Sequence, residues 1–371
     1  MINEPLYQKI YRDLYDGIKN GKYRTGDRLP SEKELSEAYE VSRITSKKAL
    51  EVLADQGYVM RKPGKGTFVI QLPAPVEVAE LNPSDEGDEQ KQPRTIGVVM
   101  DSFGTTFGPD IIRGMEFECR RRGFLMALRF TYGSMELETQ AINDMVAAGS
   151  VGILLMCTQG ESYNSEILKL HLSGYPMILF DRSMQGISIP VVETDNYKAA
   201  MELTNHLISE GHKRICFLSH SHMNTTTIAG RFSGYLNAMS ANGLVNDESL
   251  CLRDLNAILP KEDEDCSDDD GADMQRLSEY IDAHPDVTAF LAAEFGIAVM
   301  LYTVLANKGL KDKKEIAFFD GYDEDVNIFP KYPHIIQNQY QMGVTAVSSL
   351  VHMLRGEKVP AKVVIPHFLV S

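Results

Sequence analysis

The sequence predicts an α/β protein in which a small helical head precedes a larger body of two doubly wound parallel sheets. The chain has 371 residues, more than one hydrophobic core usually holds, so two or more domains are expected. Residues 71–94 combine four prolines and many acidic residues with almost no apolar periodicity, which is typical of a linker. From Thr95 onward, apolar runs alternate with amphipathic segments, as in parallel sheets covered by helices on both faces. We therefore expect a head at 1–70, a linker at 71–94 and a body at 95–371.

The head sequence predicts three helices followed by a β-hairpin. Apolar residues recur every four positions in the first helix. Ser31 and Glu34 match a capping box that begins a short second helix, and Ser42 begins a third helix. Two short strands at 58–62 and 67–70 surround a tight basic turn. The residues expected to face the core from the helices are Leu6, Ile10, Leu14, Ile18, Leu35, Ala38, Ala49, Leu50, Val52 and Leu53.

Three motifs of the head arrive in a fixed order, at 29–35 (LPSEKEL), 41–50 (VSRITSKKAL) and 64–69 (GKGTFV). Together they closely resemble the winged helix-turn-helix domain of GntR-type regulators, and the resemblance covers nearly all of the head. It implies a domain that binds double-stranded operator DNA.

Polar and basic residues occupy the positions from which such a head contacts DNA. The predicted DNA-binding residues are Ser31, Lys33, Arg43, Thr45, Lys47, Lys65 and Gly66. Those at the start of the third helix can reach base edges in the major groove, and Arg43 can bond guanine through two nitrogens. Those at the start of the second helix are placed to hold a phosphate, and those at the wing tip to approach the minor groove or the backbone. Lys33 and Lys47 stand where the family often has Arg, so they keep the charge but lose the planar fork.

The body sequence predicts two series of alternating strands and helices. The first series has strands at 95–100, 125–130, 152–156 and 176–180 and helices at 111–123, 136–148 and 166–172. The second series has helices at 198–210, 232–242, 274–283 and 298–308 and strands at 214–219, 289–292 and 315–319. Two such series suggest two subdomains that face each other across a cleft.

Short motifs spread along this body in a specific order include 96–99 (IGVV), 180–182 (FDR), 211–215 (GHKRI) and 319–321 (FDG). Their joint order resembles the LacI/GalR effector domain, which is related to periplasmic sugar-binding proteins. The resemblance implies one subdomain of about 95–193 with 337–355 and another of 194–336 with 356–371. A GntR-type head on this body resembles the arabinose-repressor type of regulator and implies a homodimer.

Ligands in parallel sheets bind at the carboxyl ends of the strands, where several polar residues of this body fall. The predicted effector-binding residues are Ser102, Phe107, Asp181, Arg182, Arg231, Glu294, Asp320 and Gln337. Carboxylates paired with Arg satisfy sugar hydroxyls, which donate and accept at once, and an aromatic face covers the apolar side of the ring. By the resemblance, all of these except Ser102 and Glu294 fall at family ligand positions. Glu294 replaces the usual Asn or Asp, which narrows the pocket or selects a different hydroxyl or even an amine.

The charge of the chain is divided between its two parts. Residues 1–72 hold 13 Lys and Arg against 10 Asp and Glu, a net charge of +3, which leaves −18 for the rest of a chain whose total is −15. A negative body beside a weakly basic head repels DNA everywhere except at the head. The sequence therefore predicts a sequence-specific transcriptional regulator, a repressor of carbohydrate-utilisation genes, whose operator binding a small sugar modulates. The alternatives are a non-regulatory intracellular carbohydrate-binding protein and an enzyme such as the aminotransferase-bodied relatives of GntR regulators.

Other features of the sequence favour a cytoplasmic protein without cofactor, metal or membrane. The five cysteines are scattered without a Cys-x-x-Cys pair, no signal peptide or membrane-spanning run appears, and no catalytic motif is found. The segment 220–222 (HSH) is interpreted as a loop with two exposed imidazoles, and the acidic run 262–273 as a solvated loop.

Overall fold

The computed structural model divides the chain into two compact units, Met1–Lys91 and Gln92–Ser371. The residues that the structure describes are 6–19, 22–24, 26–55, 58–62, 65–69, 94–102, 104, 106–158, 163–222, 225–244, 250–259, 267–321 and 331–371. The predicted linker lies outside these residues, apart from Arg94. Within the described part of the chain, no helix is long and apolar enough to cross a membrane.

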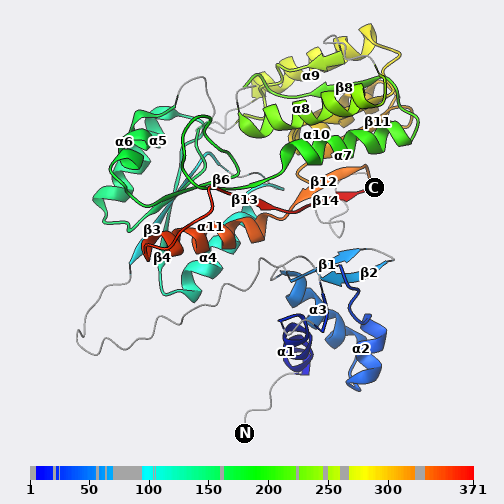
Figure 1. The fold of residues 1–371 in the computed structure, drawn as a ribbon. Helices are drawn as coiled ribbons and strands as arrows, with labels where there is room; N and C mark the ends of the chain where they lie inside the picture. Colours follow the sequence, from blue (N-terminus) through cyan, green and yellow to red (C-terminus); the bar gives the residue numbers. More distant parts are fainter. Residues whose placement is uncertain are drawn as a thin grey trace, which may run out of the picture. The chain divides into compact units, whose positions relative to one another are not determined.

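The first unit is a helical head with a β-hairpin (Figure 1). Its elements are α1 (Leu6–Lys19), α2 (Glu32–Ala38), α3 (Arg43–Asp55), β1 (Val59–Lys62) and β2 (Gly66–Val69), the strands being antiparallel. The core joins the predicted apolar faces of the helices with Leu29, Val59 and Val69. Leu6 and Ala38 are exposed instead of buried, because they are the first residue of α1 and the last of the short α2. The side chain of Val52 lies outside the described part.

The second unit contains two lobes, each built on one sheet. The sheet of the first lobe has the order β13-β7-β6-β5-β3-β4, and all its neighbouring strands are parallel. Its strands are β3 (Thr95–Met100), β4 (Leu125–Phe130), β5 (Ile153–Leu155), β6 (Met177–Phe180), β7 (Val191–Thr194) and β13 (Lys362–Ile365). Its helices are α4 (Pro109–Arg121), α5 (Met135–Ala147), α6 (Ser165–Leu172) and α11 (Gln339–Leu354).

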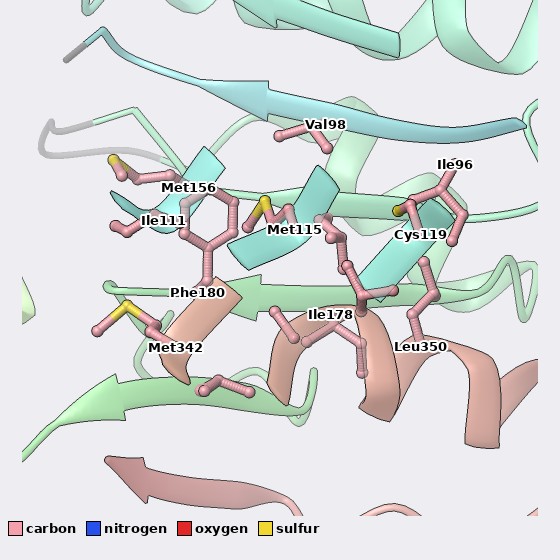
Figure 2. Packing of buried hydrophobic residues seen from close by; sticks show 14 of the residues in the cluster. Ile96, Val98, Ile111, Met115, Cys119, Met156, Ile178, Phe180, Met342 and Leu350 are labelled. Atoms are coloured by element: carbon pink, nitrogen blue, oxygen red, sulfur yellow. The ribbon is translucent and has the colours of Figure 1, made fainter. Parts of the chain in front are cut away.

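Helices cover both faces of the first-lobe sheet, as the apolar strands predict. On one face, Met115 of α4 and Leu350 of α11 pack against Ile178 and Phe180 of β6 (Figure 2). On the other face, residues of α5 and α6 pack against the same sheet.

Two glycines allow α4 and α11 to approach closely. A Cβ atom on Gly114 would lie 2.2 Å from the carbonyl oxygen of Tyr340, and one on Gly343 would lie 2.1 Å from that of Ile111. Any larger residue at either position would therefore push the two helices apart.

The sheet of the second lobe has the order β14-β12-β11-β10-β8-β9, and only β14 runs antiparallel to its neighbour. Its strands are β8 (Ile215–Leu218), β9 (Cys251–Leu252), β10 (Ala289–Ala292), β11 (Glu315–Phe319), β12 (His334–Gln337) and β14 (His367–Val370). Its helices are α7 (Asn196–Ser209), α8 (Thr226–Ala241), α9 (Ser267–Ala283) and α10 (Phe295–Asn307). Residues of α7 and α8 cover one face, and residues of α9 and α10 cover the other.

The acidic run differs from its prediction as a solvated loop. From Ser267 onward it forms the start of α9, and Asp273 is buried, where it accepts a hydrogen bond of 2.7 Å from the backbone N–H of Ala257. The residues of the run before Ser267 lie outside the described part.

The chain passes between the lobes after β7, after β12 and between β13 and β14. The strands before the first two crossings end at Thr194 and Gln337, one residue beyond the expected ends of these segments at 193 and 336, and the assignment of the whole segment 356–371 to the second lobe is wrong. After α11 the chain first adds β13 beside β7 of the first lobe, and it crosses only at Pro366. Proline has no N–H for a strand ladder, so it ends one short strand before the next begins.

Candidate functional site

The start of α3 presents an exposed surface in the head. Ser42 caps the helix, because its hydroxyl accepts the backbone N–H of Thr45 at 3.2 Å and lies 2.9 Å from the Thr45 hydroxyl. Arg43 and Lys47 are exposed, and Lys47 pairs with Glu51 at 3.5 Å. The hydroxyl of Thr45 therefore serves the cap, while Arg43 projects from the first turn.

Ile44 is a surface residue that the sequence analysis did not single out. It is 79% exposed beside Arg43. Its place within the motif at 41–50 was the available signal. An exposed aliphatic group in this first turn can contact a thymine methyl.

The start of α2 contains the predicted capping box. The Glu34 backbone N–H donates to the Ser31 hydroxyl at 3.2 Å, and the Ser31 N–H donates to the Glu34 carboxylate at 2.6 Å. Lys33 is exposed, 3.9 Å from Glu37. Since the box uses the Ser31 hydroxyl, a phosphate at this end would meet mainly the Lys33 ammonium.

The wing is tied to the helices by an ion-pair network. Arg61 of β1 pairs with Glu32 of α2 and lies 3.4 Å from Glu51 of α3. At the tip, Lys65 is exposed and Gly66 has a φ of +116°, which favours glycine. The two predicted tip residues thus lie at the turn of the hairpin, where β2 begins.

In the first lobe, the predicted residue Arg182 is held at the carboxyl end of the sheet. It pairs with Asp101, which directly follows β3, and donates to the carbonyl of Cys157 at 3.1 Å. Asp181 lies 3.4 Å from the Arg182 Nε, and its Oδ1 has no partner among the described residues. Asp101 was missed by the sequence analysis, although it follows its strand directly, as Asp181 does.

In the second lobe, Arg231 reaches the carboxyl end of the sheet from α8. Its guanidinium donates to Asn196 Oδ1 at 2.8 Å and to the carbonyl of Ala293 at 2.5 Å, and it lies 3.6 Å from Asp320. Asp320 accepts from the Gln337 side-chain N–H at 2.6 Å. Arg231, Asp320 and Gln337, all predicted, are therefore directly connected.

The two lobes bring these groups together. Asp181 of the first lobe interacts electrostatically with Arg231 and Asp320 of the second. The Ser183 N–H, next to the first-lobe site, donates to the hydroxyl of Thr226 in α8 at 3.0 Å. We call the joined set the inter-lobe cluster, and its members are Asp101, Asp181, Arg182, Asn196, His220, Arg231, Glu294, Asp320 and Gln337.

Burial raises the pKa of two acids of this cluster. It raises the pKa of Asp181 to about 6, against the opposing effect of Arg182 and Arg231. It also raises the pKa of Glu294 to about 7, although 27% of that side chain is exposed. Both carboxyl groups are therefore more easily protonated than free acids.

His220 corrects the interpretation of 220–222 as a loop with exposed imidazoles. The His220 side chain is 1% exposed at the end of β8, and His222 is partly buried. Burial, together with the nearby His222, Arg182 and Arg231, lowers the pKa of His220 to about 3. The exposed Ser221 between the two histidines bonds Asn256 Oδ1 through its N–H and its hydroxyl, while the His220 ring faces inward.

Ser102 and Phe107 lie in the loop after β3, both half-buried. Phe107 packs against the first-lobe core, and Gln339 holds this loop by bonding the Gly108 N–H at 2.8 Å and the Thr106 carbonyl at 2.7 Å. The contacts of the structure thus join six of the predicted residues, while these two stay beside the cluster. Among the described residues, no group of three or more His, Cys, Asp or Glu side chains is arranged to hold a metal ion.

A winged helical head joined to a two-lobed body with a polar cluster between its lobes defines a ligand-binding transcriptional regulator. Residues 93–371 match the family described as periplasmic binding proteins and sugar binding domain of LacI family, and the chain belongs to that family. Residues 6–69 match the family described as bacterial regulatory proteins, gntR family.

Relatives and solved structures agree with this class. The arabinose metabolism transcriptional repressor of Geobacillus stearothermophilus is 25% identical over 365 residues, which cover 96% of this chain and 93% of the relative. Catabolite control protein A of Priestia megaterium is 23% identical over 76% of this chain and 81% of its own. The structure of CcpA of Lactococcus lactis has a TM-score of 0.63 at 22% identity, over 76% of this chain and 98% of that one. A CelR–cellobiose complex also has a TM-score of 0.63, at 19% identity over 92% of this chain and 99% of that one.

Proposed function

We propose that the head binds operator DNA and that a small sugar, held by the inter-lobe cluster, changes this binding. The observation that carries the proposal is that predicted residues of both lobes form one connected polar cluster, in which some buried polar atoms lack a partner among the described residues. Asp181 Oδ1 and Gln337 Oε1 are such atoms. Because a buried polar atom without a hydrogen bond is costly, these atoms are suited to accept from ligand hydroxyls.

The head is proposed to specify sequence through the first turn of α3. Arg43 bonds guanine, Ile44 contacts a thymine methyl, and Lys33, Lys47 and Lys65 contact phosphates. Ser31, Thr45 and Gly66 then support the two helix caps and the wing tip. Two copies of the chain are proposed to bind two half-sites as a homodimer in the cytoplasm.

The body is proposed to hold an unmodified sugar between its lobes. Asp181, Glu294 and Asp320 accept from ring hydroxyls, Arg182 donates to them, and Phe107 with Ser102 lines the side toward the first lobe. The arabinose metabolism relative is named as a repressor, so we propose that the sugar releases the operator. The proposal includes no cofactor and no catalytic step.

The test is operator binding with and without sugar. An operator selected from random duplexes is labelled, and its dissociation constant is measured at one fixed salt concentration with L-arabinose, D-ribose, D-xylose, D-galactose, D-glucose or cellobiose present. We expect at least one sugar to weaken binding about 10-fold or more, the scale of an allosteric coupling of 1–3 kcal/mol. Operator binding that no sugar in the panel changes would contradict the proposal.

The matched control is a variant of the exposed helix α6, Lys169→Gln, which lies outside both sites. It should keep the wild-type operator affinity and the wild-type sugar response. A random duplex of the same length measures the binding that does not depend on sequence.

A further inference from the structure

His220 presents one defined hydrogen-bond donor to the inter-lobe cluster. Its Nδ1 accepts the backbone N–H of His222 at 3.1 Å, so the proton of the neutral ring is on Nε2. That Nε2 is buried and has no hydrogen-bond partner in the described part of the chain. A buried N–H without an acceptor is costly, which indicates that a ligand atom satisfies it.

Glu294 presents the matching acceptor. It occupies the N-cap position of α10, but its side chain makes no capping hydrogen bond. Its Oε2 lies 3.9 Å from His220 Nε2, too far for a hydrogen bond between them. An oxygen atom placed about 2.8 Å from both atoms completes both bonds.

We propose that His220 and Glu294 together select one hydroxyl group of the bound sugar, a role that rests on the proposed function. A hydroxyl accepts from His220 Nε2–H and donates to Glu294 at the same time. An ammonium group has no acceptor for the imidazole N–H, and an ether oxygen has no proton for the carboxylate. The pair therefore excludes the amine that Glu294 alone would accept.

The surrounding charges complete the specificity. Arg182 and Asp181 of the first lobe and Arg231 and Asp320 of the second face Glu294. Since each guanidinium already pairs with an aspartate, the unpaired charge of the site is negative. The ligand class is thus a neutral sugar with a free hydroxyl at this position, and sugar phosphates and sugar acids are excluded.

The experiment compares binding of a sugar and its analogues to the full-length protein by calorimetry. The sugar of the panel above that binds most tightly is measured with its complete set of monodeoxy and aminodeoxy derivatives and its phosphate ester. Removing one particular hydroxyl should weaken binding roughly 10- to 100-fold, the scale expected for a hydrogen bond to a charged group. The amino derivative at that position and the phosphate ester should bind no better than the deoxy sugar.

Two variants identify the pair as the cause. In His220→Leu, removing that hydroxyl from the sugar should lower the binding affinity by less than about 3-fold. The affinity of the amino derivative should rise relative to that of the parent sugar, because only the Glu294 carboxylate remains to bind this position. Glu294→Gln, at a partly exposed position, should also reduce the cost of removing the hydroxyl. His206→Leu, which removes an imidazole from α7 of the same lobe, should keep the wild-type order of all analogues.

The outcomes separate this inference from the proposed function. If a sugar binds and changes operator affinity, but His220→Leu keeps the wild-type cost of every missing hydroxyl, the pair does not select a hydroxyl. Tightest binding by a phosphate ester or an amino sugar also overturns the inference. If no sugar of the panel binds, the proposed function fails together with it.

Discussion

Replacing Asp320 by Asn tests the central ion pair of the second lobe with little other change. Asp320 has a φ of +65°, a conformation that Asn tolerates better than most residues. The Asn side chain keeps an oxygen that can accept from Gln337, which donates to Asp320 at 2.6 Å. The substitution therefore removes the negative charge that lies 3.6 Å from Arg231 and keeps the shape.

The expected loss of stability follows from what Arg231 retains. Removing one partner of a buried ion pair costs about 3–5 kcal/mol when the other charge is left alone. Arg231 still donates to Asn196 and to the carbonyl of Ala293, so we expect about 1–3 kcal/mol. At about 2–4 °C per kcal/mol for a unit of this size, the melting temperature should fall by roughly 2–12 °C.

The assay is thermal unfolding of the full-length protein with and without the best-binding sugar. Loss of a charge-assisted hydrogen bond should also weaken sugar binding about 10- to 100-fold. Asp320→Ala should melt lower than Asp320→Asn, because a left-handed backbone costs about 1–2 kcal/mol with alanine. A melting temperature and a sugar response of Asp320→Asn equal to those of wild type would remove Asp320 from the site.

Three further substitutions test other parts of the molecule. Asp181→Asn should increase the free energy of unfolding by about 1–3 kcal/mol at pH 8, because the pKa of this acid is raised to about 6 and the fold disfavours its ionised form. Measured by urea denaturation, this gain in stability should shrink as the pH falls from 7 to 4. A loss of stability at pH 8 would refute the reasoning. Thr226→Val removes the hydroxyl that accepts the Ser183 N–H across the lobes and should weaken sugar binding roughly 3- to 10-fold by calorimetry, whereas unchanged affinity would show that this contact does not favour the bound form. Arg43→Ala should lower affinity for the selected operator by about 1–3 kcal/mol and affinity for a random duplex much less, and equal losses in a binding titration would exclude base recognition.

The sequence predicts much of the cluster because of one geometric rule. The carboxyl ends of parallel strands meet at one edge of a sheet, so a charged residue directly after an apolar strand lies at that edge. This rule locates Asp181, Glu294 and Asp320, and it would also have located Asp101, which directly follows β3. The positions of these acids can therefore be predicted from the local sequence, without knowing which distant residues they contact.

Other features depend on contacts that a local pattern does not contain. The strands β13 and β14 are short, and each pairs with a strand far away in the sequence. The lobe to which each of them belongs is therefore determined by its partner strand and not by its own residues. His220 turns inward because its neighbours bond Asn256 and its own ring nitrogen. In the head, the exposure of Ile44 depends on how α3 packs against α1, which periodicity leaves open.

The charges of the cluster explain why a neutral ligand would favour approach of the lobes. Asp181 of the first lobe raises the pKa of Glu294 of the second, and Asp320 of the second lobe raises the pKa of Asp181, so bringing the lobes together places like charges near each other. Sugar hydroxyls that donate to Asp181 or to Glu294 offset this repulsion, but only when one sugar molecule contacts both lobes at the same time. Since a ligand shifts an equilibrium only through its different affinity for the two states, this offset is the source of that difference. An anionic ligand would add to the repulsion instead, so the same charges that select the ligand also determine which arrangement of the lobes it stabilises.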